Sequence, residues 1–84
     1  MDLKETQAFL AKIELFRSFD EKEYHDLASA VREKKYKKGE LLFRENGTRE
    51  GIFIIYNGEV ELFKSNSYGV EFRLSLFGRR DFLG

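Results

Sequence analysis

The residue types that catalysis needs are scarce in this 84-residue chain, which has one histidine and no cysteine. His25 lies among acidic and aromatic neighbours and has no serine beside it. Without a Ser-His or Cys-His pair, nucleophilic catalysis has no candidate. A single histidine without cysteines also cannot supply the ligand set of a zinc site. We therefore expect no enzymatic activity and no metal site.

Charged residues are balanced, with Lys plus Arg and Asp plus Glu at 15 each. A zero net charge gives no long-range attraction to nucleic acid, so we expect no nucleic-acid binding through this segment. One basic cluster stands out, and we interpret it as a solvated edge strand, with anion contact as the alternative: Arg32, Lys34, Lys35, Lys37 and Lys38. Likewise, Arg79 and Arg80 indicate a surface turn or, alternatively, a source of positive potential for an anion.

Four glycines lie in separate turns and form none of the glycine-rich strings that cradle phosphates: Gly39, Gly47, Gly58 and Gly69. We predict that they are structural turn residues. The strongest turn signal is Asn57-Gly58, where both residues tolerate the positive φ of a two-residue hairpin turn.

The N-terminal part, residues 1–31, has helical periodicity. The first helix is indicated by apolar residues at three- and four-residue steps: Phe9, Leu10, Ile13 and Phe16. Asp20 and Glu23 predict a capping box at the start of a second helix, and Phe19 can staple against Tyr24. That helix should end near Val31. Its apolar face comprises Tyr24, Leu27, Ala28 and Val31. The acidic run Asp20, Glu21, Glu23 and Asp26 is explained by capping and the helix dipole.

From residue 32 the period changes to two, which predicts short antiparallel strands at 40–43, 52–56, 59–64 and 70–77. Phe72, Leu74 and Leu76 should share one face of the last strand. The expected fold class is mainly β with N-terminal helices: an antiparallel β-roll of the double-stranded β-helix or jelly-roll type. A roll needs about eight strands, so we expect it to be incomplete at the C-terminus. Residues 1–84 then form a single truncated domain, with 1–31 helical and 32–84 the first strands.

The N-terminus is too polar for a signal peptide, and the longest apolar run, 52–56, is far below the ~18 residues of a membrane helix. These features predict a cytoplasmic protein that does not enter a membrane.

The strand half resembles the cyclic-nucleotide-binding domain shared by the catabolite activator protein family, protein kinase A regulatory subunits and cyclic-nucleotide-gated channels. The resemblance rests on ordered fragments: Leu15-Phe16, Lys38-Gly39-Glu40, Leu42-Phe43, Glu45-Asn46-Gly47, Phe53-Ile54-Ile55, Gly58-Glu59-Val60, Gly69-Val70-Glu71 with Leu74, and Arg80-Asp81-Phe82-Leu83-Gly84. Two positions depart from the family pattern. Thr48 replaces an Asp, and Arg80 replaces a Gly, which makes a bent, positive-φ backbone less favourable at that position.

The resemblance implies cAMP or cGMP as the ligand of the complete domain, with no cofactor held by the fragment itself. In the family, a phosphate-binding cassette with a ribose-binding Glu and a phosphate-binding Arg follows the position of Gly84. Leu83 and Gly84 would border it. The pocket wall would comprise Val60, Leu62, Phe72 and Leu74. Plain core packing is the alternative for these four residues.

The expected function is therefore that of a regulatory, allosteric domain in signal transduction. Its output, whether transcription regulation, kinase control or channel gating, is not readable from these residues. The alternative is a β-roll interaction or dimerisation module that binds no nucleotide. Because the fragment leaves its apolar strand faces uncovered, we also expect it to self-associate.

Overall fold

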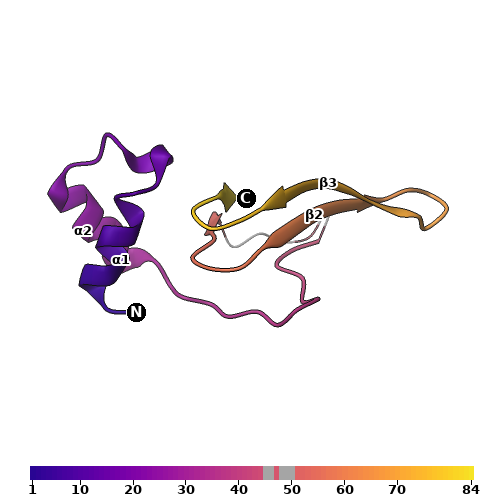
Figure 1. Cartoon of the computed structure of the whole chain (residues 1–84), viewed down its shortest axis with the longest axis horizontal. Coiled ribbons are helices and arrows are strands. Elements are labelled where there is room, and N and C mark those ends of the chain that lie inside the picture. Colours follow the sequence, from indigo (N-terminus) through magenta and orange to yellow (C-terminus); the bar gives the residue numbers. More distant parts are fainter. Residues whose placement is uncertain (45–46, 48–50) are drawn as a thin grey trace. The chain divides into compact units, whose positions relative to one another are not determined.

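The computed structural model describes residues 1–44, 47 and 51–84 (Figure 1). The chain divides into two compact units, Met1–Glu50 and Gly51–Gly84. The first holds helices and the second holds strands, and each is described by itself. Glu45, Asn46 and Thr48, which belong to the family-like turn, lie outside the described residues.

Helix α1 spans Leu3–Leu10 and begins at Asp2, whose side chain accepts the backbone N–H of Glu5 at 2.7 Å. The helix ends earlier than its apolar period predicts. The N–H groups of Lys12 and Ile13 bond to carbonyls three residues back, so the last turn tightens. Ile13 then adopts an extended conformation, which suits a β-branched residue.

The apolar core of the first unit is formed mainly by α1 and the residues just after it. Phe9, Leu10 and Ile13 are buried there, and Ala28 is buried on α2. The short 3-10 helix η1 spans Glu14–Phe16. The change of helix type after Leu10 therefore leaves the predicted apolar residue Ile13 in the core, although it no longer belongs to the helix.

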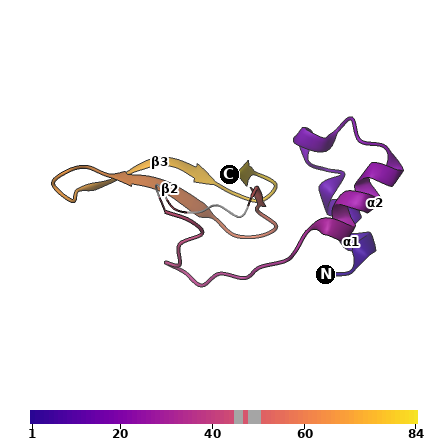
Figure 2. The same ribbon diagram turned by 180° about the vertical axis from the view of Figure 1, so that it is seen from behind.

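Helix α2 spans Glu21–Ala30 and packs beside α1 (Figures 1 and 2). The predicted capping box is confirmed: Asp20 accepts the N–H of Glu23 at 2.8 Å, and Glu23 accepts that of Asp20 at 3.1 Å. The predicted staple is also present, since the rings of Phe19 and Tyr24 are 5.7 Å apart. The helix ends at Val31, as its pattern indicates.

The predicted strand at 40–43 is wrong. Residues 31–44 form no strand, and 31–41 are exposed. A turn occurs instead, in which Glu40 N–H bonds to the Lys37 carbonyl at 3.0 Å and Gly39 has a φ of +88°. Period-two polarity produces a strand only where another strand supplies hydrogen bonds, and the four described strands pair with one another instead. The basic cluster is accordingly exposed but is not an edge strand.

Strands β2, Val60–Ser65, and β3, Glu71–Phe77, form an antiparallel hairpin close to the predicted bounds. The Asn66 side-chain oxygen closes the turn by accepting the N–H groups of Tyr68 at 2.9 Å and Val70 at 3.0 Å. Gly69, with a φ of +79°, completes a three-residue loop. The loop therefore depends on one side chain and one glycine.

Strands β1, Phe53–Ile54, and β4, Phe82–Leu83, form a second antiparallel pair. The predicted hairpin at Asn57-Gly58 is wrong, because β1 and β2 lie in different sheets. Gly58 does have a positive φ, +98°. The positive φ redirects the chain from one sheet to the other. Local turn propensity is the same for a turn of this kind and for a hairpin turn, so it could not tell the two apart.

The observed architecture thus has short N-terminal helices followed by antiparallel strands in two small sheets. It agrees with a partial β-roll. Across the described residues, none of the helices has the length and apolar character that crossing a bilayer requires.

Candidate functional site

The candidate site lies where β4 ends, at Leu83 and Gly84. Leu83 is opposite Phe53 in the register of β1 and β4, and it is buried. Gly84 is exposed. The β1–β4 pair therefore positions the end of the family-like motif.

The backbone of Gly51 and Ile52 lies unusually close to Gly84. A β-carbon on Gly84 would be 2.9 Å from the Gly51 carbonyl oxygen and 3.0 Å from the Ile52 α-carbon. Because real β-carbons do not approach backbone atoms so closely, any larger residue would force a shift. The close contact that favours glycine here is with the chain's own backbone, and it needs no ligand to explain it.

A tight turn at 78–81 leads into β4. The Asp81 N–H bonds to the Gly78 carbonyl at 3.0 Å, and the Asp81 carboxylate accepts the Gly78 N–H at 2.7 Å. Arg80 has a φ of +74°, the one positive value among the described non-glycine residues. The bent, positive-φ backbone that arginine makes unfavourable at this position is thus present.

Two backbone hydrogen bonds tie this turn to β1. Ile55 donates to the Asp81 carbonyl at 2.9 Å and accepts from the Arg80 N–H at 2.8 Å. The Arg79 guanidinium lies over the Tyr56 ring, 5.4 Å from its centroid. This distance allows a cation-π contact, so Arg79 is oriented by an aromatic side chain and Arg80 by its backbone.

The predicted pocket wall is only partly assembled on one face of the hairpin. Antiparallel residues directly opposite each other share a face. Val60 and Leu62 therefore share a face with Lys64, and Lys64 is opposite Phe72. Val60 and Leu62 are half-buried, whereas Phe72 and Leu74 are 46% and 56% exposed.

The register shifts by one residue between Leu62 and Phe63, which leaves Leu74 without an opposite residue. This irregularity corrects the prediction that Phe72, Leu74 and Leu76 share a face. Leu76 is opposite Glu61, on the other face from Phe72. An extra residue in one strand reverses the alternation beyond it. The salt bridge from Arg73 to Glu61, at 3.2 Å, lies on the Leu76 face.

The charged residues of α2 form surface pairs. Lys22 bonds to Asp26 at 2.9 Å. This hydrogen bond raises the pKa of Lys22 and lowers the pKa of Asp26. The His25 ring lies 3.7 Å from Asp26. In the described part of the chain, no three acidic or histidine side chains converge to hold a metal ion.

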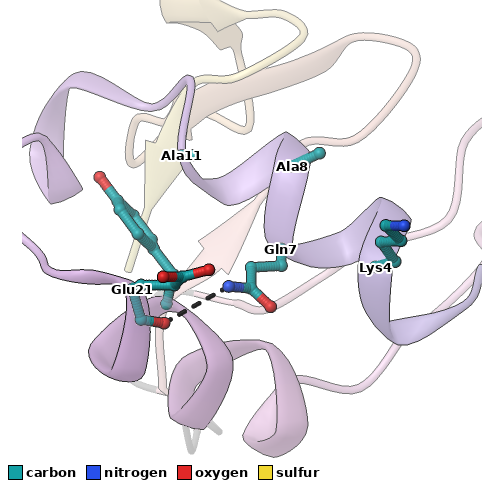
Figure 3. Close-up of a pocket in the computed structure, with 6 residues that line it drawn as sticks. Lys4, Gln7, Ala8, Ala11 and Glu21 are labelled. Carbon is teal, nitrogen blue, oxygen red and sulfur yellow. Dashed lines mark hydrogen bonds between the residues drawn. The ribbon is translucent and has the colours of Figure 1, made fainter.

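A groove in the helical unit was not singled out by any sequence motif (Figure 3). It has a volume of about 490 Å³ and is lined by Lys4, Gln7, Ala8, Ala11, Glu21 and Tyr24. Gln7 spans it by donating to the Glu21 carbonyl at 3.4 Å. Among its lining residues, only Tyr24 belongs to a feature that the sequence analysis named, the apolar face of the second helix.

Comparison with known proteins defines the class of this chain. The profile of the family described as the cyclic nucleotide-binding domain matches residues 33–84, more than half of the chain. The match begins within the basic cluster and covers all four strands that the structure describes. The chain therefore belongs to the cyclic nucleotide-binding domain family, a class of regulatory modules.

The curated relatives include a regulatory subunit of a cAMP-dependent protein kinase and two cGMP-dependent protein kinases. The chain is 33% identical to a cAMP-dependent protein kinase regulatory subunit of Blastocladiella emersonii, over 68% of this chain and 14% of that protein. It is 27% identical to a cGMP-dependent protein kinase of Plasmodium berghei (strain Anka) and 30% identical to one of Toxoplasma gondii. Both alignments cover the whole chain but only 9% and 8% of those proteins. No solved structure gives a significant match.

Proposed function

We propose that this chain is the N-terminal portion of a regulatory domain that binds cAMP or cGMP and has no catalytic role of its own. The observation that carries the proposal is the family match over residues 33–84, in which the family-like fragments follow one another in order. On this proposal, residues 1–84 belong to one domain, whose further strands complete a jelly-roll.

The geometry at the end of β4 supports this assignment. The turn at 78–81 and the β1–β4 pair hold Leu83 and Gly84 in a defined position. By resemblance, the cassette follows directly, and it combines helix N-terminal N–H groups with an Arg guanidinium, a general arrangement for binding phosphate. None of these 84 residues matches the cassette's Glu or Arg. We therefore expect no useful nucleotide affinity from these residues alone.

Titration calorimetry with cAMP and cGMP tests the proposal. The 84-residue chain should be compared with the native protein extended by about 40 residues, enough for the remaining strands of a roll. Binding by the longer protein alone supports the proposal. If neither protein binds, the nucleotide proposal fails. A variant of the longer protein with its cassette Arg changed to Ala is the matched control, because it removes the phosphate partner and leaves these residues unchanged.

The named relatives favour kinase control, among the outputs open to the family, over transcription regulation. Each relative is a cyclic-nucleotide-dependent kinase or a regulatory subunit of one. In such a role, ligand occupancy shifts the equilibrium between two arrangements of the flanking helices, and α1 and α2 would belong to that responding layer. A cytoplasmic location fits this role.

The second candidate function is an interaction module that binds no nucleotide. Two observations favour it: Gly84 contacts its own backbone, and Phe72 and Leu74 of the proposed pocket wall are largely exposed. The calorimetric comparison separates the candidates, since a module of this kind gives no heat with either nucleotide at either length.

A further inference from the structure

One edge of strand β3 has no strand partner among the residues that the structure describes. The strand pairs with β2 along its other edge. Val70, just before the strand, is 56% exposed, and Phe72 and Leu74 within it are 46% and 56% exposed. An exposed apolar strand edge offers backbone hydrogen bonds to another strand, and natural proteins cover or block such edges. This edge is therefore the strongest unassigned interaction surface of the strand unit.

The charges on β3 are self-complementary in one antiparallel register. If Phe72 faces Phe72 of a second copy, then Glu71 faces Arg73 of that copy, and the same pair recurs by symmetry. Registers centred on Glu71 or Arg73 place like charges directly opposite each other, which is destabilising. A register centred on Leu74 places Arg73 opposite Ser75, so neither Glu71 nor Arg73 faces an opposite charge. Only the Phe72 register among these four satisfies both charged residues.

The side-chain arrangement within one copy agrees with this register. Arg73 is held on one face by its bond to Glu61 at 3.2 Å, and its side chain remains 57% exposed. Residues 71–73 precede the irregularity at Leu74, so they form a regular stretch of strand.

We propose that two copies of this chain associate through the free β3 edges in an antiparallel, two-fold symmetric pair centred on Phe72, with reciprocal Glu71–Arg73 ion pairs. The occupant of the edge is a second copy because the charge pattern complements itself. Dimerisation of the 84-residue chain is measured without nucleotide, so this proposal can fail or succeed separately from the proposed function.

Charge exchange tests the register. Glu71→Arg alone would bring the introduced arginine against Arg73 of the second copy, and Arg73→Glu alone would bring two glutamates together. Each single variant should raise the dimer dissociation constant about tenfold, because two attractive pairs become repulsive. An equimolar mixture of the two variants restores opposite charges at both positions. It should therefore recover the dimer, measured by light scattering during size exclusion or by analytical ultracentrifugation.

Matched charge changes away from β3 provide the control. Glu59→Arg and Arg32→Glu alter exposed residues and carry the same changes in net charge. Each should dimerise as the native chain does, alone and mixed. A native chain that stays monomeric up to its solubility limit overturns the proposal. Single variants that dimerise normally, or a mixture that stays dissociated, overturn it as well.

A cross-link gives a second readout that does not depend on charge. The chain has no cysteine, so Phe72→Cys introduces a single thiol. In the proposed register the β-carbons of the two introduced cysteines are about 4.5–5.5 Å apart, close to the spacing of a disulfide. Oxidised glutathione should convert this variant to a covalent dimer, whereas Ser67→Cys in the hairpin loop should remain largely uncoupled. Equal cross-linking of the two variants contradicts the register.

Discussion

The backbone N–H of Arg80 donates a 2.8 Å hydrogen bond to the Ile55 carbonyl, although Arg80 has a φ of +74°. A β-carbon makes this conformation unfavourable by about 1–2 kcal/mol. The bond to Ile55 and the Asp81 carboxylate bond to Gly78 N–H hold the turn in place. The strained residue thus lies directly before the strand that ends at Gly84.

Replacing Arg80 with glycine should therefore stabilise the chain. Glycine adopts positive φ without strain but loses more entropy on folding. We expect a net gain of about 0.5–1 kcal/mol in the free energy of unfolding, measured by urea denaturation. Arg79→Gly is the matched control, because Arg79 has no positive φ and a glycine there should destabilise. Equal effects of the two substitutions would contradict this account.

The β2–β3 hairpin should depend on Asn66 and not on Asn57. Asn66→Ala removes the acceptor of two backbone N–H groups, so we expect a loss of about 1–2 kcal/mol. Asn57→Ala, outside the hairpin, should cost less than half as much. Amide hydrogen exchange of Val60–Ser65 and Glu71–Phe77 reports the hairpin directly. Faster exchange in the Asn57 variant than in the Asn66 variant would show that the wrong turn had been assigned.

The capping box should set the stability of α2. Asp20→Ala leaves the Glu23 N–H without its side-chain acceptor and should cost about 1 kcal/mol, with lower helicity by circular dichroism. Asp20→Ser keeps a capping oxygen and should retain most of the native helicity. Equal losses in both variants would mean that the cap interaction does not support the helix.

The Lys22–Asp26 pair predicts a defined pH dependence. Its hydrogen bond lowers the pKa of Asp26 below the usual 3.8, so the Asp26 contribution is present above 3.8 and is lost as pH falls through the lowered pKa. The bond raises the pKa of Lys22 above 10.5, so that contribution is lost only as pH rises through the raised value.

A double-mutant cycle with Lys22→Met and Asp26→Asn measures this pair. The coupling free energy between Lys22 and Asp26 should be constant near neutral pH. It should disappear in acid once Asp26 is protonated. Because both side chains are exposed and screened by solvent, the coupling should be small and should decrease with added salt. If the coupling free energy persisted in acid, it would have to come from packing of the two side chains and not from their charges.

Local patterns in the sequence determined several features correctly. The capping box, the end of α2 near Val31 and strands β2 and β3 all depend on neighbours within a few residues, and the structure has them. The family was also identifiable from fragments such as Gly58-Glu59-Val60, because their order survives in the chain. In the candidate site, arginine at position 80 argued against a positive φ, and only the structure shows that the backbone adopts it.

Only the tertiary structure decided how distant segments pair. The Asn57-Gly58 turn does not form a hairpin, because β1 takes β4 as its partner, far along the chain. The strand predicted at 40–43 is absent for the same reason, since alternating polarity cannot provide a neighbouring strand. The irregularity at Leu74 and the contact of Gly84 with Gly51 also arise between segments. Hydrogen bonds across a sheet depend on which backbones meet, and a residue's local propensity carries no information about its distant partner.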